Sequence, residues 1–172
     1  MEISKEALNR AKDLCSFLDK GITPYHVVKN VSEKLLENGF KELKYEEKWE
    51  ISENFKGFVK YHDSSIFAFT LNKDFIEKGF KFIMSHIDSP CLKIKTKCDN
   101  LTSSLDLYLN VEVYGGAILN TWLDRGLSIG GKVYIKSKDY ENNFNVEEKL
   151  IDFKEEVLTI VNCPIHLNRE IN

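Results

Sequence analysis

The sequence has no surplus of positive charge: its 172 residues include 24 basic and 27 acidic side chains, for a formal net charge of −3. Proteins that bind nucleic acid through its phosphates carry clustered cations, so we do not expect nucleic acid as a partner. No apolar run is long enough to span a bilayer. The opening residues, MEISKEALNR, lack the apolar core of a signal peptide. We therefore expect a cytoplasmic protein without a membrane partner.

Close cysteine pairs are also missing. The four cysteines form no C-x-x-C motif, which argues against a disulfide scaffold and against the common zinc fingers. We expect reduced, mostly buried thiols. A structural zinc site built from Cys91, Cys98, Cys163 and a histidine is a weaker alternative. Neither a G-x-S-x-G elbow nor a G-x-x-x-x-G-K loop occurs, so the sequence indicates neither a serine nucleophile nor a phosphate-binding loop.

What the sequence does contain is ordinary globular material, with 42% hydrophobic and 30% charged residues. Two amphipathic helices open the chain. The first follows Ser4 as N-cap and ends at Gly21. The second begins at Thr23-Pro24, where a hydroxyl precedes a proline at the first helical position, and ends near Gly39.

Strand patterns follow the helices, which predicts a layered α/β domain. Up to residue 95 they cover residues 55–61, 66–71 and 80–84. Beyond it the chain turns β-rich, with strands expected at residues 105–114, 132–136, 148–153 and 157–161 and a polar loop within 139–148. We therefore divide the chain near residue 96, into an α/β part (1–95) and a β-rich part (96–172).

The sharpest chemical motif, Ser85-His86-Ile87-Asp88-Ser89-Pro90, directly follows the 80–84 segment. In an extended chain, residues two apart point roughly the same way, so His86 and Asp88 suit a metal-binding imidazole beside an orienting carboxylate. The alternative is a loop histidine capped by a nearby aspartate. Zinc takes three or four ligands, and this motif supplies one.

Two further segments stand out. Tyr114-Gly115-Gly116-Ala117, followed by residues 120–128 (NTWLDRGLS), favours a structural turn with an aromatic anchor. His166 lies among apolar residues, which is typical of a packed, hydrogen-bonded histidine. The same interpretation applies to His26, whereas His62 beside Asp63 indicates a turn.

Taken together, these segments resemble the aspartyl aminopeptidase (aminopeptidase I) family of zinc metallopeptidases. Residues 86–95, HIDSPCLKIK, resemble its H-x-D-S-P-x-L-x-x-K signature. Residues 114–116 and 121–125 are similar to its Y-G-G and T-W-x-D-R blocks, and residues 164–169 to its I-H-L-x-R block. Residues 23–28, TPYHVV, resemble its S-P-[FY]-H segment. The order and spacing also agree.

The resemblance implies an α/β catalytic domain interrupted by an inserted, β-rich dimerisation domain. It implies two Zn²⁺ ions per subunit, peptide substrates cut at the amino-terminal residue, and a dimer-based homo-oligomer, expected to be a dodecamer. His86 matches a zinc ligand and Asp88 the acidic residue that orients it. His166 matches a substrate-binding histidine that acts across a subunit interface.

Members of that family are much longer than this chain. Their remaining metal ligands and their glutamate general base fall beyond Asn172. The resemblance therefore describes an amino-terminal portion that is inactive alone. The alternative is a short, catalytically inactive homologue that works as an assembly or regulatory module.

Overall fold

The computed structural model describes residues 3–96, 108–137 and 145–163. By its internal contacts the chain forms two compact units. The first combines the residues up to Asp88 with residues 130–152, and the second combines residues 89–129 with those from Phe153 onward. This division does not test the boundary expected near residue 96, which stays a prediction.

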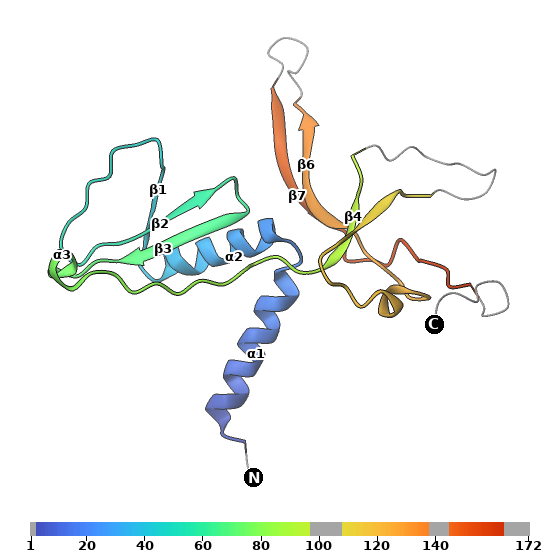
Figure 1. Cartoon of the computed structure of the whole chain (residues 1–172), viewed down its shortest axis with the longest axis horizontal. Coiled ribbons are helices and arrows are strands. Elements are labelled where there is room, and N and C mark those ends of the chain that lie inside the picture. The colour runs from blue at the N-terminus through green and yellow to red at the C-terminus, as the bar shows by residue number, and fades with distance from the viewer. Residues whose placement is uncertain (1–2, 97–107, 138–144, 164–172) are drawn as a thin grey trace. The chain divides into compact units, whose positions relative to one another are not determined.

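Both expected helices are confirmed (Figure 1). Helix α1 spans Lys5–Lys20, and the Ser4 hydroxyl at its N-cap accepts a hydrogen bond from the Ala7 amide at 3.2 Å. Helix α2 spans Pro24–Glu37 with Thr23 as its N-cap. In the described part of the chain, no helix is both long and apolar enough to cross a membrane.

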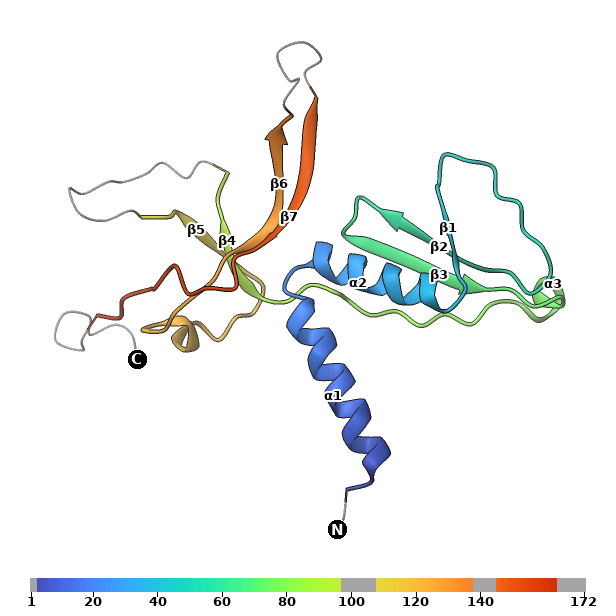
Figure 2. The ribbon, with the colours of Figure 1, turned by 180° about the vertical axis from the view of Figure 1, so that it is seen from behind.

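A three-stranded sheet lies against α2, as Figures 1 and 2 show from opposite sides. Its strands are β1 (Lys41–Leu43), β2 (Lys56–Tyr61) and β3 (Ser65–Thr70), in that order. Strand β1 pairs parallel to β2, and β2 pairs antiparallel to β3. The predicted strands 55–61 and 66–71 are confirmed, while β1 was not predicted. The buried apolar side chains of the described residues gather here: Val28, Leu43, Phe58 and Leu71.

The first unit also holds a separate hairpin of β6 (Gly130–Lys136) and β7 (Val146–Asp152), seen as two long strands in Figure 2. The strands pair antiparallel from Gly130 opposite Asp152 to Lys136 opposite Val146. The predictions for residues 132–136 and 148–153 are confirmed. The expected loop lies partly outside the described residues.

The second unit contains β4 (Cys91–Ile94) and β5 (Val111–Tyr114), paired antiparallel, and the short 3-10 helix η1 (Leu119–Trp122). Strand β5 confirms the carboxyl-terminal part of the strand expected at 105–114. The strand expected at 157–161 is wrong: only an isolated bridge joins Leu127 and Leu158 there.

The strand expected at 80–84 is also wrong. A short helix, α3 (Phe75–Lys78), ends at Gly79, and the chain then runs to Pro90 without regular secondary structure. A strand needs a neighbour to hydrogen-bond with, and none of the described strands pairs with this segment. Its apolar side chains lie in solvent instead, with Ile83 100% and Met84 90% exposed.

Candidate metal-binding corner

His86 and Asp88 contact each other at the end of this extended segment. The His86 Nδ1 atom lies 2.9 Å from the main-chain oxygen of Asp88 and 3.2 Å from its Oδ1 atom. Both Asp88 atoms are acceptors, so a proton on Nδ1 can be donated to either. Among the neutral forms of the ring, this arrangement favours the tautomer in which Nε2 carries the lone pair, the form in which that nitrogen can bind a metal.

The imidazole is accessible, since 83% of the His86 side chain is exposed against 38% of the Asp88 side chain. The contact is what the H-x-D spacing predicted. It is shared by both interpretations of the motif, the metal ligand and the capped loop histidine. The metal role of His86 and the orienting role of Asp88 therefore stay predictions.

The donor set of the described residues fits one corner of a zinc site. No group of three or more histidine, cysteine, aspartate and glutamate side chains gathers within the described ranges. A zinc ion takes three or four protein ligands, so the described residues do not complete a zinc site by themselves. His166 and Cys98 lie outside the described residues. The expectation of buried thiols is wrong for Cys15 and Cys163, which are exposed.

The glycine pair of the second motif forms a structural turn, as expected. Gly115 has a φ of +73°, and a Cβ built on it would lie 3.5 Å from Pro90. Further along, Asp124 Oδ1 accepts a hydrogen bond from the Asn162 amide at 2.9 Å, and the Asp124 amide donates to Ile160 at 2.8 Å. These polar groups connect the two chain segments of the second unit.

The other two described histidines have local roles. His26 Nδ1 lies 2.7 Å from the Thr23 hydroxyl, which confirms a hydrogen-bonded histidine. Burial lowers the pKa of His26. The negative charge of Asp152 raises this pKa by a smaller amount, and the positive charge of Lys29 lowers it further. His62 takes a φ of +49° in the turn between β2 and β3, as its position beside Asp63 indicated.

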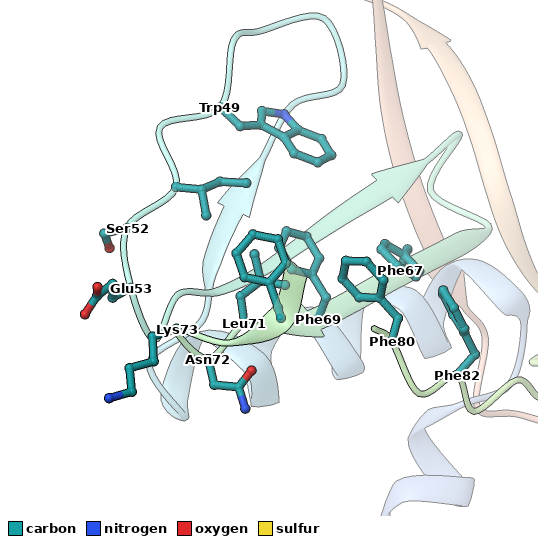
Figure 3. A pocket seen from close by; sticks show the side chains of 12 residues that line it. Trp49, Ser52, Glu53, Phe67, Phe69, Leu71, Asn72, Lys73, Phe80 and Phe82 are labelled. Atoms are coloured by element: carbon teal, nitrogen blue, oxygen red, sulfur yellow. The ribbon is translucent and has the colours of Figure 1, made fainter. Parts of the chain in front are cut away.

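A hollow of about 580 Å³ lies in the first unit (Figure 3). Aromatic side chains from the 49–53 loop, β3 and the 80–82 segment point toward it, including Trp49, Phe69 and Phe80. Neither His86 nor Asp88 lines it. The hollow is thus an apolar packing surface separate from the candidate metal corner.

The sequence profile of the Peptidase M18 family, described as aminopeptidase I zinc metalloprotease, matches residues 17–172. The chain belongs to the M18 family. A probable M18 family aminopeptidase 2 of Clostridium acetobutylicum is 44% identical over 169 residues, and an aspartyl aminopeptidase of Caenorhabditis elegans is 37% identical over 166 residues. These matches cover 98% and 96% of this chain, but 38% and 34% of the relatives. The M18 chain described here thus spans little more than a third of their length.

The fold agrees with M18 structures as well. The structure described as the S. cerevisiae mApe1 dodecamer superposes on 89% of the chain with a TM-score of 0.79 and 30% identity, covering 35% of that protein. The family resemblance and the mixed α/β fold are therefore confirmed. The described residues do not show an inserted dimerisation domain.

Charged residues that the sequence did not point to meet around Lys132 on β6. Its Nζ atom lies 3.1 Å from Glu148 Oε2 and 3.7 Å from Asp63 Oδ2. Asp63 and Lys132 are far apart in the sequence, and no spacing rule connects them. Lys132 lies in a strand where polar and apolar residues alternate, as in any half-exposed strand. Nothing in the sequence therefore indicated that it would lie beside Glu148 and Asp63.

Proposed function

We propose that this chain is the amino-terminal part of a zinc-dependent, cytoplasmic aminopeptidase that removes amino-terminal residues from peptides. The observation that carries the proposal is the M18 profile match over residues 17–172, within which His86 contacts Asp88. One of the similar proteins is named an aspartyl aminopeptidase. Acidic amino-terminal residues are accordingly the first substrates to try.

In this proposal His86 Nε2 is one zinc ligand, and Asp88 holds the opposite ring nitrogen. The carboxylate and carbonyl of Asp88 both accept from Nδ1–H, which orients the ring and leaves Nε2 available for the metal. Two bound zinc ions would supply Lewis acidity and a water of lowered pKa. The remaining ligands and the general base would come from outside these 172 residues, so the chain alone would be inactive.

The division of labour along the chain is part of the same proposal. Residues 1–95 would belong to the catalytic domain, and residues 96–172 would begin the inserted dimerisation domain. His166 would bind substrate across a subunit interface. The similarity to a protein whose structure is described as a dodecamer supports a dimer-based homo-oligomer of that size.

The test supplies the part of an M18 protein that this chain does not contain. The chain is joined to the carboxyl-terminal region of the Clostridium acetobutylicum relative, beginning where the 169-residue alignment ends. We expect this chimera to hydrolyse aspartyl, glutamyl or leucyl p-nitroanilides and to lose that activity on chelation. The 172-residue chain alone should show no turnover.

The deciding variant is His86→Ala in the chimera, which should lower activity by at least about 100-fold because a zinc ligand is lost. His62→Asn is the matched control, since asparagine tolerates the left-handed turn conformation that His62 adopts. Both variants are checked by circular dichroism and gel filtration. A folded chimera whose activity survives both chelation and His86→Ala would overturn the proposal.

A further inference from the structure

Lys132 lies in the middle of an aromatic and acidic environment on the hairpin. Its side chain is 10% exposed. The ammonium nitrogen lies 4.8 Å from the ring centroid of Tyr25 and 5.5 Å from that of Tyr134. Glu148 Oε2 is 3.1 Å away, and Asp63 Oδ2 is 3.7 Å away. The Lys132 ammonium group thus contacts two aromatic rings and two carboxylates.

These partners come from separate elements of the first unit. Tyr25 is in the first turn of α2, and Asp63 is in the turn between β2 and β3. Asp63 and His62 have φ angles of +54° and +49°, both in the left-handed region. Left-handed backbone costs free energy in residues other than glycine. Here it occurs where the Asp63 carboxylate meets Lys132.

The charge of Lys132 persists in this environment. Burial by itself lowers the pKa of the ammonium group, but hydrogen bonds to Tyr134 and Glu148 and the Glu148 charge outweigh it and raise the pKa overall. The attraction between a cation and an aromatic face is stronger when water is excluded from the contact. The contact is therefore ionic throughout the neutral range.

Apolar packing between the hairpin and the rest of the first unit is incomplete. A hollow of about 340 Å³ is lined by α2, by β1, by β7 and by the β2–β3 region. Only Val28, Leu36 and Leu150 give it aliphatic lining, and most of its other lining side chains are charged. The charged and aromatic contacts of Lys132 therefore lie where aliphatic packing is sparse.

The hairpin is also a sheet of its own. Among the described strands, β6 and β7 pair only with each other, and β1, β2 and β3 form a different sheet. No ladder hydrogen bond would break if the hairpin left α2. A two-stranded hairpin without packing partners is marginally stable in water, so the loss of the attachment would expose its amides to exchange.

We propose that Lys132 attaches the β6–β7 hairpin to α2 and the β2–β3 turn, and that the hairpin can detach from them while α2 and the three-stranded sheet stay folded. The Thr23–His26 segment then has a role as a docking point for the hairpin. Tyr25 contacts Lys132, and a Cβ built on Gly130 would lie 2.6 Å from Ile22, just before the helix.

The test is hydrogen exchange of the whole chain, followed by mass spectrometry. Lys132→Met keeps the length and the apolar stem of the side chain and removes the charge. We expect amides of 130–136 and 146–152 to exchange about tenfold faster or more, with little change in α2 and β2. Lys149→Met on the same hairpin is the control, because Lys149 is 55% exposed and pairs with its neighbour Glu147 at 3.4 Å.

Tyr25→Leu and the double variant complete the design. If the ring acts through the cation, Tyr25→Leu should accelerate hairpin exchange in the native background and add little in the Lys132→Met background. Equal exchange in Lys132→Met and Lys149→Met would overturn the proposal. So would acceleration spread evenly over α2, β2 and the hairpin, because the hairpin would then not detach separately.

Discussion

The Nδ1 atom of His86 lies 3.2 Å from the Asp88 carboxylate and 2.9 Å from the Asp88 carbonyl, so one ring nitrogen has two acceptors from one residue. Removing the carboxylate in Asp88→Ala leaves the carbonyl in place. We therefore expect zinc affinity in the chimera to fall by about tenfold, the low end for residues that orient a metal ligand. Competition with a chromogenic chelator measures this affinity.

Asp88→Asn separates charge from contact in the same experiment. The amide oxygen can still accept from Nδ1–H, so the loss should be smaller than in Asp88→Ala. A loss as large as that of His86→Ala would contradict an orienting role and would make Asp88 a zinc ligand itself.

A second prediction concerns the core of the first unit. Phe58 on β2 is 0% exposed, and its truncation to alanine leaves a cavity. We expect Phe58→Ala to lower the free energy of unfolding by about 3–5 kcal/mol. Urea unfolding followed by tryptophan fluorescence gives this value. Phe67→Ala on β3 is the control, because Phe67 is 53% exposed and should cost about 1 kcal/mol or less.

The sequence predicted those parts of the molecule whose causes are local. Helix α1 follows from Ser4 and Gly21, and α2 from Thr23-Pro24, since capping and termination depend on a few neighbouring residues. The contact between His86 and Asp88 also follows from a spacing of two. The family resemblance rests on short segments in a fixed order and is confirmed by the M18 match.

Features that depend on distant residues were not predicted. The 80–84 segment has the composition of a buried strand, yet it pairs with none of the described strands. The prediction failed because a strand needs a pairing partner, and composition does not reveal whether one is present. The contact of Lys132 with Tyr25 and Asp63 requires three elements to meet. No periodicity in the sequence carries that information.

The stability of the first unit should depend on pH through His26. Burial lowers its pKa in the folded chain, so the unfolded chain binds the proton more readily. The contribution of neutral His26 to the free energy of unfolding is fully present above the pKa of histidine in the unfolded chain, about 6.5. It should decrease as the pH falls through that value and level off below the folded pKa.

His26→Gln isolates this contribution. Glutamine three residues after Thr23 can form a capping box, so the start of α2 should be kept while the titration is removed. Thermal unfolding of both proteins between pH 8 and pH 5 measures the effect. The native chain should lose more stability over this range than His26→Gln. Parallel pH profiles would show that His26 does not contribute.

The last prediction concerns the apolar surface beside the hollow of Figure 3. Phe82 lines the hollow and is 67% exposed, and Met84, two residues further along the chain, is 90% exposed. Large exposed apolar surfaces bind hydrophobic dyes and promote association. The 172-residue chain should therefore bind anilinonaphthalene sulfonate and associate as its concentration rises, and Phe82→Ser with Met84→Ser should reduce both. Ile76→Ser is the control, because Ile76 is 82% exposed on α3 and does not line the hollow.

If this surface packs against the rest of an M18 protein, the chimera should bind less dye per chain than the 172-residue chain. Equal dye binding by the two would contradict that packing.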